Sequence, residues 1–326
     1  MPMRQVGKAH PSHRLLASFA CLRAESETAC RTNVTSTTGG VIALTQTQDQ
    51  QATEKTIAEE ALELEALLVA RAYLYELFHK CFGGTPNQDL LDALTSDVTL
   101  SIVDEYADDN PSMAGLIAFL KERGTIERDQ LLDHARDEYT RIFVGPVNLP
   151  ASPYESPYIG AHDMSLFQEN TLTVRKLYHS RGYRVCKEQR VPDDHVSIMC
   201  HFLALQAGHA LETFESGDAT ELTATLRSQF AFAETHLANW LGTFAESVRN
   251  SKAGAAAVLY PQLLEALAAF VNSDSVFLKE AAYWAEQTDG ALFAMSRHFG
   301  MARESLERLR SIRLFGLEDN ELVICE

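Results

Sequence analysis

The sequence lacks the features that mark β-sheet proteins, membrane proteins and disulfide-stabilised proteins. It contains no Asn-Gly hairpin signal and no sustained alternation of apolar and polar residues, so strands are not indicated. No apolar run approaches the roughly 18 residues of a transmembrane helix, so stable membrane insertion is not expected. The six cysteines form no CxxC pair and no zinc-binding spacing, which is typical of reduced thiols in the cytoplasm.

Sequence motifs of catalysis and of nucleotide binding are missing as well. We find no Gly-x-Ser-x-Gly nucleophile motif, no cysteine in a recognisable nucleophile motif, and neither standard type of glycine-rich phosphate loop. The sequence therefore predicts a protein that is not an enzyme, has no catalytic residues and carries no cofactor.

Acidic residues outnumber basic ones by 45 to 28, which gives a formal net charge of −17. A field of this sign repels nucleic acid and attracts cations or basic peptides. We therefore expect no nucleic-acid partner.

The first part of the chain has the composition of a disordered extension. Residues 1–52 are rich in Ser, Thr and Gln, as in TNVTSTTGG at Thr32 to Gly40. Basic residues precede a short apolar run, Leu15 to Leu22, in the manner of a secretory signal, but Ser18 interrupts this run. We expect residues 1–52 to be disordered and the protein to be cytoplasmic.

What the sequence has in abundance is helical periodicity. Apolar residues recur at helical spacing from Ala61 to Phe82, and Gly83-Gly84 predicts a left-handed stop. A second periodic run predicts one continuous helix from Leu222 to Val248. Two further helices are predicted over Ala253 to Val271 and Ser275 to Gln287. The predicted fold class is all-α, a bundle of about ten helices.

Proline is scarce except in one stretch, Tyr139 to Tyr158, which holds four of the ten prolines and four aromatic residues. Proline lacks the amide hydrogen and disfavours the α conformation of the residue before it, so no helix continues here. We predict a hinge at 144–161 between helical groups at 53–143 and 162–289, followed by a basic helical tail with an acidic end at 290–326. Such a joint leaves both a monomer and a domain-swapped dimer open.

The turn Val191-Pro192-Asp193-Asp194-His195 precedes another predicted helix. In one interpretation Asp194 caps this helix and His195 lies at its surface. In the other, the aspartates bind an arginine of an extended peptide, because a guanidinium pairs with a carboxylate and stacks on aromatic rings.

A metal-dependent, all-helical phosphohydrolase is the alternative function. His162-Asp163 would supply a His-Asp pair, with further ligands from His134, His195, His201 or Asp194. A two-residue motif is common, however, and Asp163 also stands where a helix cap is expected. A helical adaptor without a peptide groove is a third interpretation.

Three motifs together resemble a known family. YTRIFVGP…PYESPY, then PDDH, then HLANW (His236 to Trp240) occur in the order typical of the TorD/DmsD redox-enzyme maturation chaperones. The resemblance implies an all-helical cytoplasmic chaperone that binds the twin-arginine signal peptide of a molybdopterin-dependent oxidoreductase before export. Val191 departs from the family pattern, which usually has glutamate there, and Asp193 is the acidic residue that could replace it.

The resemblance also implies the site residues. Signal-peptide binding is assigned to eight residues of the two motifs: Tyr139, Phe143, Tyr154, Glu155, Ser156, Asp193, Asp194 and His195. The hinge is assigned to four: Gly145, Pro146, Pro153 and Pro192. No metal ligand is assigned.

Overall fold

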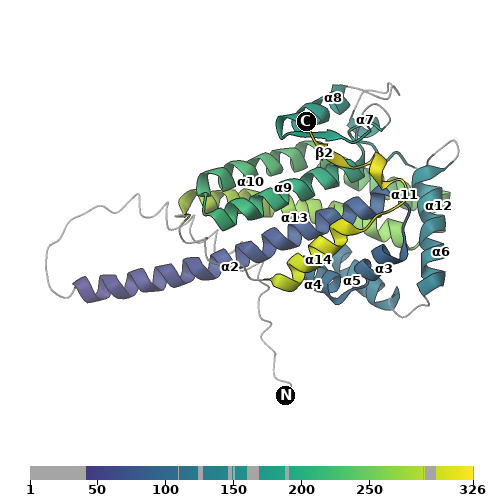
Figure 1. Ribbon diagram of the computed structural model, residues 1–326. Helices are drawn as coiled ribbons and strands as arrows, with labels where there is room; N and C mark the ends of the chain where they lie inside the picture. Colours follow the sequence, from purple (N-terminus) through teal and green to yellow (C-terminus); the bar gives the residue numbers. More distant parts are fainter. Residues whose placement is uncertain are drawn as a thin grey trace, which may run out of the picture.

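The structure is a computed structural model, and it describes residues 42–108, 110–123, 128–145, 149, 151–159, 169–187, 191–288, 290 and 299–325. Helices pack side by side around one continuous hydrophobic core, with a small sheet at one end (Figure 1). The predicted all-α class is confirmed. Among the described residues, no helix has both the length and the apolar character that crossing a bilayer requires.

The longest and most central helix is α2, Ile42–Gly83. No glycine or proline interrupts it before Gly83, and at ~1.5 Å per residue it is about 63 Å long. Its N-terminal turns extend beyond the neighbouring helices (Figure 1). The prediction of disorder through residue 52 is therefore wrong for residues 42–52, which are helical, while residues 1–41 lie outside the described part.

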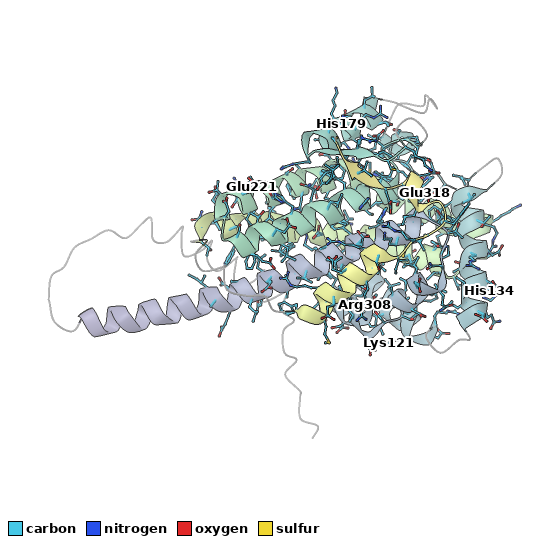
Figure 2. All side chains as sticks on the ribbon, in the orientation of Figure 1. Lys121, His134, His179, Glu221, Arg308 and Glu318 are labelled. Carbon is cyan, nitrogen blue, oxygen red and sulfur yellow. The ribbon has the colours of Figure 1, made fainter. Side chains whose placement is uncertain are left out.

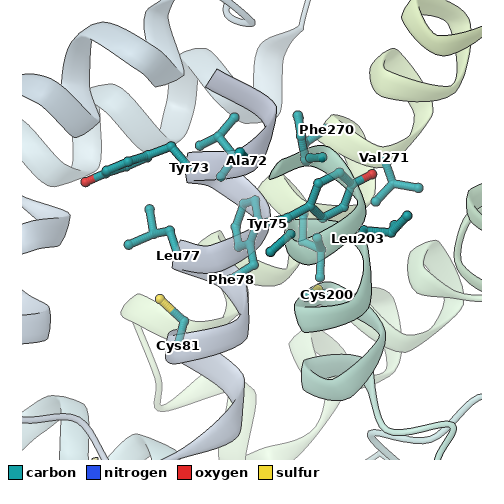
Figure 3. Close-up of a cluster of buried hydrophobic side chains, with 14 of the residues drawn as sticks. Ala72, Tyr73, Tyr75, Leu77, Phe78, Cys81, Cys200, Leu203, Phe270 and Val271 are labelled. Atoms are coloured by element: carbon teal, nitrogen blue, oxygen red, sulfur yellow. The ribbon is translucent and has the colours of Figure 1, made fainter. Parts of the chain in front are cut away.

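The C-terminal half of α2 is buried on every side. All residues from Leu67 to Gly83 are buried, as expected for a helix that other helices surround. Figure 3 shows part of this core, where Tyr75 and Phe78 of α2 lie close to Phe270 of α13, and the ring centroids of Tyr75 and Phe270 are 4.9 Å apart.

The two glycines that end α2 act differently from the prediction. Neither Gly83 nor Gly84 adopts a positive φ, so the predicted left-handed stop is wrong. A Cβ at Gly83 would lie 2.4 Å from Ser197 Oγ, and one at Gly84 would lie 2.7 Å from Leu314 Cβ. Glycine is needed here because other segments pack directly against the backbone.

Short helices follow on one side of α2, ahead of the predicted hinge. They are α3 (Gln88–Leu94), α4 (Asp97–Asp104), α5 (Pro111–Arg123) and α6 (Arg128–Tyr139). Asn87 and Ser96 cap α3 and α4 by accepting hydrogen bonds from backbone amides. A π-turn, η1 (Thr140–Val144), leads into the predicted hinge at 144–161, and the one-turn helix α7 (Ser156–Ile159) lies within it.

The elements after the hinge begin with α8 (Glu169–Ser180), β1 (Tyr183–Val185) and α9 (Val196–Ser216). Gly182 has φ +79° just beyond α8, where a left-handed residue ends a helix. Helix α9 runs along α2 and, with α10 (Ala219–Ala233) and α13 (Leu259–Gln287), completes the core.

The predicted single helix from Leu222 to Val248 is wrong, since it is broken into three parts. Helix α10 passes into a π-turn, η2 (Glu234–Ala238), and α11 (Leu241–Asn250) starts in a new direction after Trp240, whose φ of −134° is not helical. The indole Nε1–H of Trp240 donates to the carbonyl of His236 at 2.6 Å. A π-turn shifts the helical register, and this side-chain bond satisfies one of the carbonyls that it releases.

The two helices predicted on either side of residues 272–274 are instead a single helix, α13, preceded by the short α12 (Lys252–Ala255). The polar sequence Asn272-Ser273-Asp274 favours a turn in isolation. In the folded chain Asp274 is fully buried and pairs with Arg71 of α2, whose Nη2 is 3.1 Å from its Oδ2. The buried ion pair therefore lies within a continuous helix.

The C-terminal segment is helical only in its first part. Helix α14 (Gly300–Ser311) packs on α2, and the chain then passes through the 3₁₀ turn η4 (Leu317–Asp319) into β2 (Leu322–Ile324). Strand β2 pairs antiparallel with β1, with Arg184 opposite Val323. This sheet is not evident from the sequence, because three-residue strands are too short to show an alternation of apolar and polar residues.

Candidate functional site

The fold brings the hinge motif and the PDDH turn together as neighbouring backbone segments. Tyr154 and His195 form an isolated antiparallel bridge. On either side of it, Glu155 N donates to Asp194 O at 3.1 Å and Val196 N donates to Pro153 O at 2.9 Å. We call this contact between residues 153–156 and 192–196 the hinge junction.

Asp194 fastens the hinge to this turn. Its Oδ2 accepts a hydrogen bond from Ser156 N at 2.9 Å and another from the Ser156 hydroxyl. Ser156 begins α7, so Asp194 caps α7 and not α9, contrary to the capping interpretation. Its second oxygen, Oδ1, is buried and has no hydrogen-bond partner among the described residues.

His195 caps α9 in place of Asp194. The His195 Nδ1 accepts from Ser197 N at 3.2 Å, and the ring lies 5.0 Å from the ring of Tyr154. Only 6% of the residue is exposed, so it is not the surface residue of the capping interpretation. Burial lowers the pKa of His195 to about 3, so its imidazole is neutral and able to accept this bond.

Asp193 binds Arg175 of α8. The Arg175 Nη2 lies 2.6 Å from Asp193 Oδ2, and its Nε lies 3.1 and 3.2 Å from the two carboxylate oxygens. The Tyr178 hydroxyl donates to the Asp193 carbonyl at 3.0 Å. Helix α8 is therefore attached to the turn by both a charged and a neutral contact.

Glu155 pairs with His236 at the π-turn η2. The His236 Nδ1 is 3.1 Å from each carboxylate oxygen, and both side chains are buried. Burial raises the pKa of Glu155, an effect that the hydrogen bond from His236 partly opposes. The indole that bonds the His236 carbonyl belongs to Trp240, which stacks on Tyr158 of α7 at 5.3 Å.

All three carboxylates of the hinge junction are thus buried and bound to groups of the protein itself. Glu155, Asp193 and Asp194 are each 1% exposed. Three carboxylates in one small volume create a strongly negative potential, and burial followed by these three charges raises the pKa of the Tyr178 hydroxyl. The cationic partner Arg175 compensates part of this potential, and His236 is hydrogen-bonded to Glu155.

The remaining sequence-predicted residues are divided between two places. Tyr154 and Ser156 lie in the hinge junction, with the buried Pro153 and Pro192 beside them. Tyr139 and Phe143 instead pack with Phe82 and Tyr260 in an aromatic cluster, with ring centroids 5.3 to 6.4 Å apart. Gly145 ends η1, and Pro146 lies outside the described residues.

Three site residues were not among those predicted from the sequence: Arg175, Tyr178 and His236. His236 and Trp240 stand in the HLANW motif, so their motif was the available signal. Nothing in the sequence around Arg175 marks it, because its partner lies 18 residues away across a turn and a strand.

Among the described residues, those expected to bind metal in a phosphohydrolase do not form a site. His162 and Asp163 lie outside the described residues. His134 is exposed on α6 (Figure 2). His201 is half-buried; its Nδ1 accepts from Leu322 N at 3.0 Å, and its ring stacks on that of His79 with the centroids 4.2 Å apart. Within the described part, no group of three or more metal-binding side chains is found.

A pocket of about 210 Å³ opens beside the hinge junction, between α8 and α10. Its walls are largely apolar and include Leu177, Phe202 and Phe232, with His236 at one side and Arg181 at another. No carboxylate lines it. A pocket of this kind accepts an apolar side chain more readily than a cationic one.

Fold and site together define an all-helical protein in which a buried polar junction links a proline-containing hinge to the start of a core helix. Residues 105–246, which contain the whole junction, match the family model described as nitrate reductase delta subunit. The chain is 24% identical to the chaperone protein TorD of Shewanella oneidensis over 212 residues, which is 65% of this chain and 91% of the relative.

Two further relatives carry the same name. The TorD chaperone proteins of Photobacterium profundum and Vibrio cholerae are each 29% identical over 153 residues, covering 46% and 47% of this chain and 66% of each relative. No solved structure matches the chain significantly. The chain is thus similar to TorD chaperones over much of its length.

Proposed function

We propose that this protein is a cytoplasmic maturation chaperone that binds the twin-arginine signal peptide of a molybdopterin-dependent oxidoreductase until the enzyme is ready for export. The observation that carries the proposal is the position of the hinge junction, built from the motifs that resemble the TorD/DmsD chaperones, inside the matched residues 105–246. The acidic charge of −17 favours a basic peptide as partner.

The proposed peptide site covers the hinge junction and the pocket between α8 and α10. In this proposal the half-buried aromatic rings of Phe143 and Tyr154 contact the peptide. The hydrogen bonds of Asp194 with Ser156 and of His195 with the start of α9 fix the backbone of this surface. The apolar part of the peptide packs against the apolar wall of the pocket, because burying it removes apolar surface from water.

Titration of the purified full chain with synthetic peptides tests this function. One peptide has two adjacent arginines followed by an apolar segment, and its control has two lysines in their place. Because only guanidinium binds carboxylate through two parallel hydrogen bonds, we expect the lysine peptide to bind at least roughly tenfold more weakly by calorimetry. Equal affinity for both peptides, or binding of neither, would contradict the proposal.

A further inference from the structure

The pairing of Arg175 with Asp193 is the feature of the hinge junction that a purely structural role explains least well. Asp193 is 1% exposed at its side chain, whereas Arg175 is 22% exposed. The guanidinium therefore lies between the carboxylate and the solvent. An arginine that approached Asp193 from outside would meet Arg175 first.

The geometry at Asp193 is already that of guanidinium binding. Arg175 presents Nε and Nη2 to the two carboxylate oxygens at 2.6 to 3.2 Å, the side-on arrangement of a charge-assisted pair. A guanidinium from another chain would need the same two oxygens and the same approach. Exchanging one guanidinium for the other leaves the charge of the site unchanged.

A second observation indicates that the junction has capacity for a further donor. Asp194 Oδ1 is buried without a hydrogen-bond partner among the described residues. Buried carboxylate oxygens are normally satisfied. A guanidinium carries five N–H donors, more than one carboxylate can use, and the residue next to Asp193 in the chain has an acceptor that no described residue uses.

We propose that the Asp193 carboxylate is the subsite for an arginine of the client peptide and that Arg175 occupies this subsite until the peptide displaces it. The inference rests on the proposed function. It assigns the arginine contact to Asp193 and leaves Asp194, bound to Ser156, with a structural role. Displacement also releases one attachment of α8 and leaves the bond from the Tyr178 hydroxyl to the Asp193 carbonyl as the other.

Arg175→Ala is the decisive variant. Removing the internal guanidinium leaves Asp193 open, so affinity for the Arg-Arg peptide should rise by roughly tenfold, the factor expected when a partly exposed charged pair no longer has to be broken. Arg175→Lys keeps the charge but cannot bind the carboxylate through two parallel hydrogen bonds, so it should raise the peptide affinity by a smaller factor. This variant also preserves the test if Arg175→Ala does not fold, as judged by circular dichroism.

Lys176→Ala is the matched control. It removes one positive charge from the next position of α8, where the side chain is exposed, so it changes the net charge equally without touching Asp193. Its effect on peptide affinity should stay within about twofold because exposed charges are screened. Asp193→Asn should weaken binding and should abolish the gain in the double variant with Arg175→Ala.

The outcomes separate this inference from the function on which it rests. If the wild-type chain binds the Arg-Arg peptide and Arg175→Ala binds it no better than Lys176→Ala does, the Asp193 subsite is refuted and the proposed function stands. If Arg175→Ala improves binding of the Lys-Lys peptide equally, the subsite is not one for guanidinium. If neither the wild-type chain nor Arg175→Ala binds the Arg-Arg peptide, both proposals fail.

Discussion

Replacing Asp194 by asparagine tests whether the hinge junction stabilises the fold. The carboxylate accepts two hydrogen bonds from Ser156 while fully desolvated. Asparagine keeps one oxygen acceptor but removes the charge from a buried position. A hydrogen bond to a charged group contributes about 1.5 to 3 kcal/mol, against about 1 kcal/mol for a neutral pair, so weakening both bonds should cost about 3 kcal/mol.

Urea unfolding followed by tryptophan fluorescence is a suitable assay, because Trp240 stacks on Tyr158 just after the hinge junction. With a dependence on urea of about 3 kcal/mol per molar, the midpoint should fall by about 1 M. The control is Asp137→Asn, the same chemical change at a 68% exposed aspartate, which pairs with Arg141 at the surface. This control should change stability by less than about 1 kcal/mol.

A double-mutant cycle with Ser156→Ala tests whether Asp194 stabilises the fold through its hydrogen bonds with Ser156. If Asp194 acts through Ser156, the two substitutions together should cost clearly less than the sum of their separate costs, with a coupling of about 1 kcal/mol or more. Equal midpoints for Asp194→Asn and Asp137→Asn would refute the view that this carboxylate fastens the hinge to the turn.

Two further predictions concern the core. Burial lowers the pKa of His201 from 6.5 to about 4, so the unfolded chain binds a proton at this residue at a higher pH than the folded chain does. The free energy of unfolding should therefore fall as the pH falls below 6.5, by about 2 kcal/mol between pH 7 and pH 5 from this residue. Urea midpoints at both pH values should show a smaller difference for His201→Asn, and an unchanged difference would contradict the assignment. Asp274→Ala leaves the fully buried Arg71 uncompensated and should cost about 3 to 5 kcal/mol, whereas Arg71→Met with Asp274→Leu should recover most of it. A double variant as unstable as the single one would show that the cost is not that of an unpaired charge.

The sequence by itself determined the features that depend on neighbouring residues. Helical periodicity from Ala61 to Phe82 indicated α2, and the prolines of Tyr139 to Tyr158 indicated a break. Each of these follows from backbone conformation or from apolar residues at helical spacing, both of which are local properties. The order of three short motifs also indicated the resemblance to TorD chaperones, to which the chain is similar.

Tertiary structure alone decided where helices bend, where they continue, and which polar groups meet. The periodic run from Leu222 to Val248 gave no sign of the break before Trp240, and the turn-forming residues near Asp274 lie within α13, where Asp274 binds Arg71, 203 residues away in the sequence.

The same holds for the site. Asp193 and Asp194 were recognised as a pair, yet their partners lie on other segments, with Arg175 on α8 and Ser156 at the hinge. A buried charge must find its partner in space, so its role becomes visible only when the chain is folded.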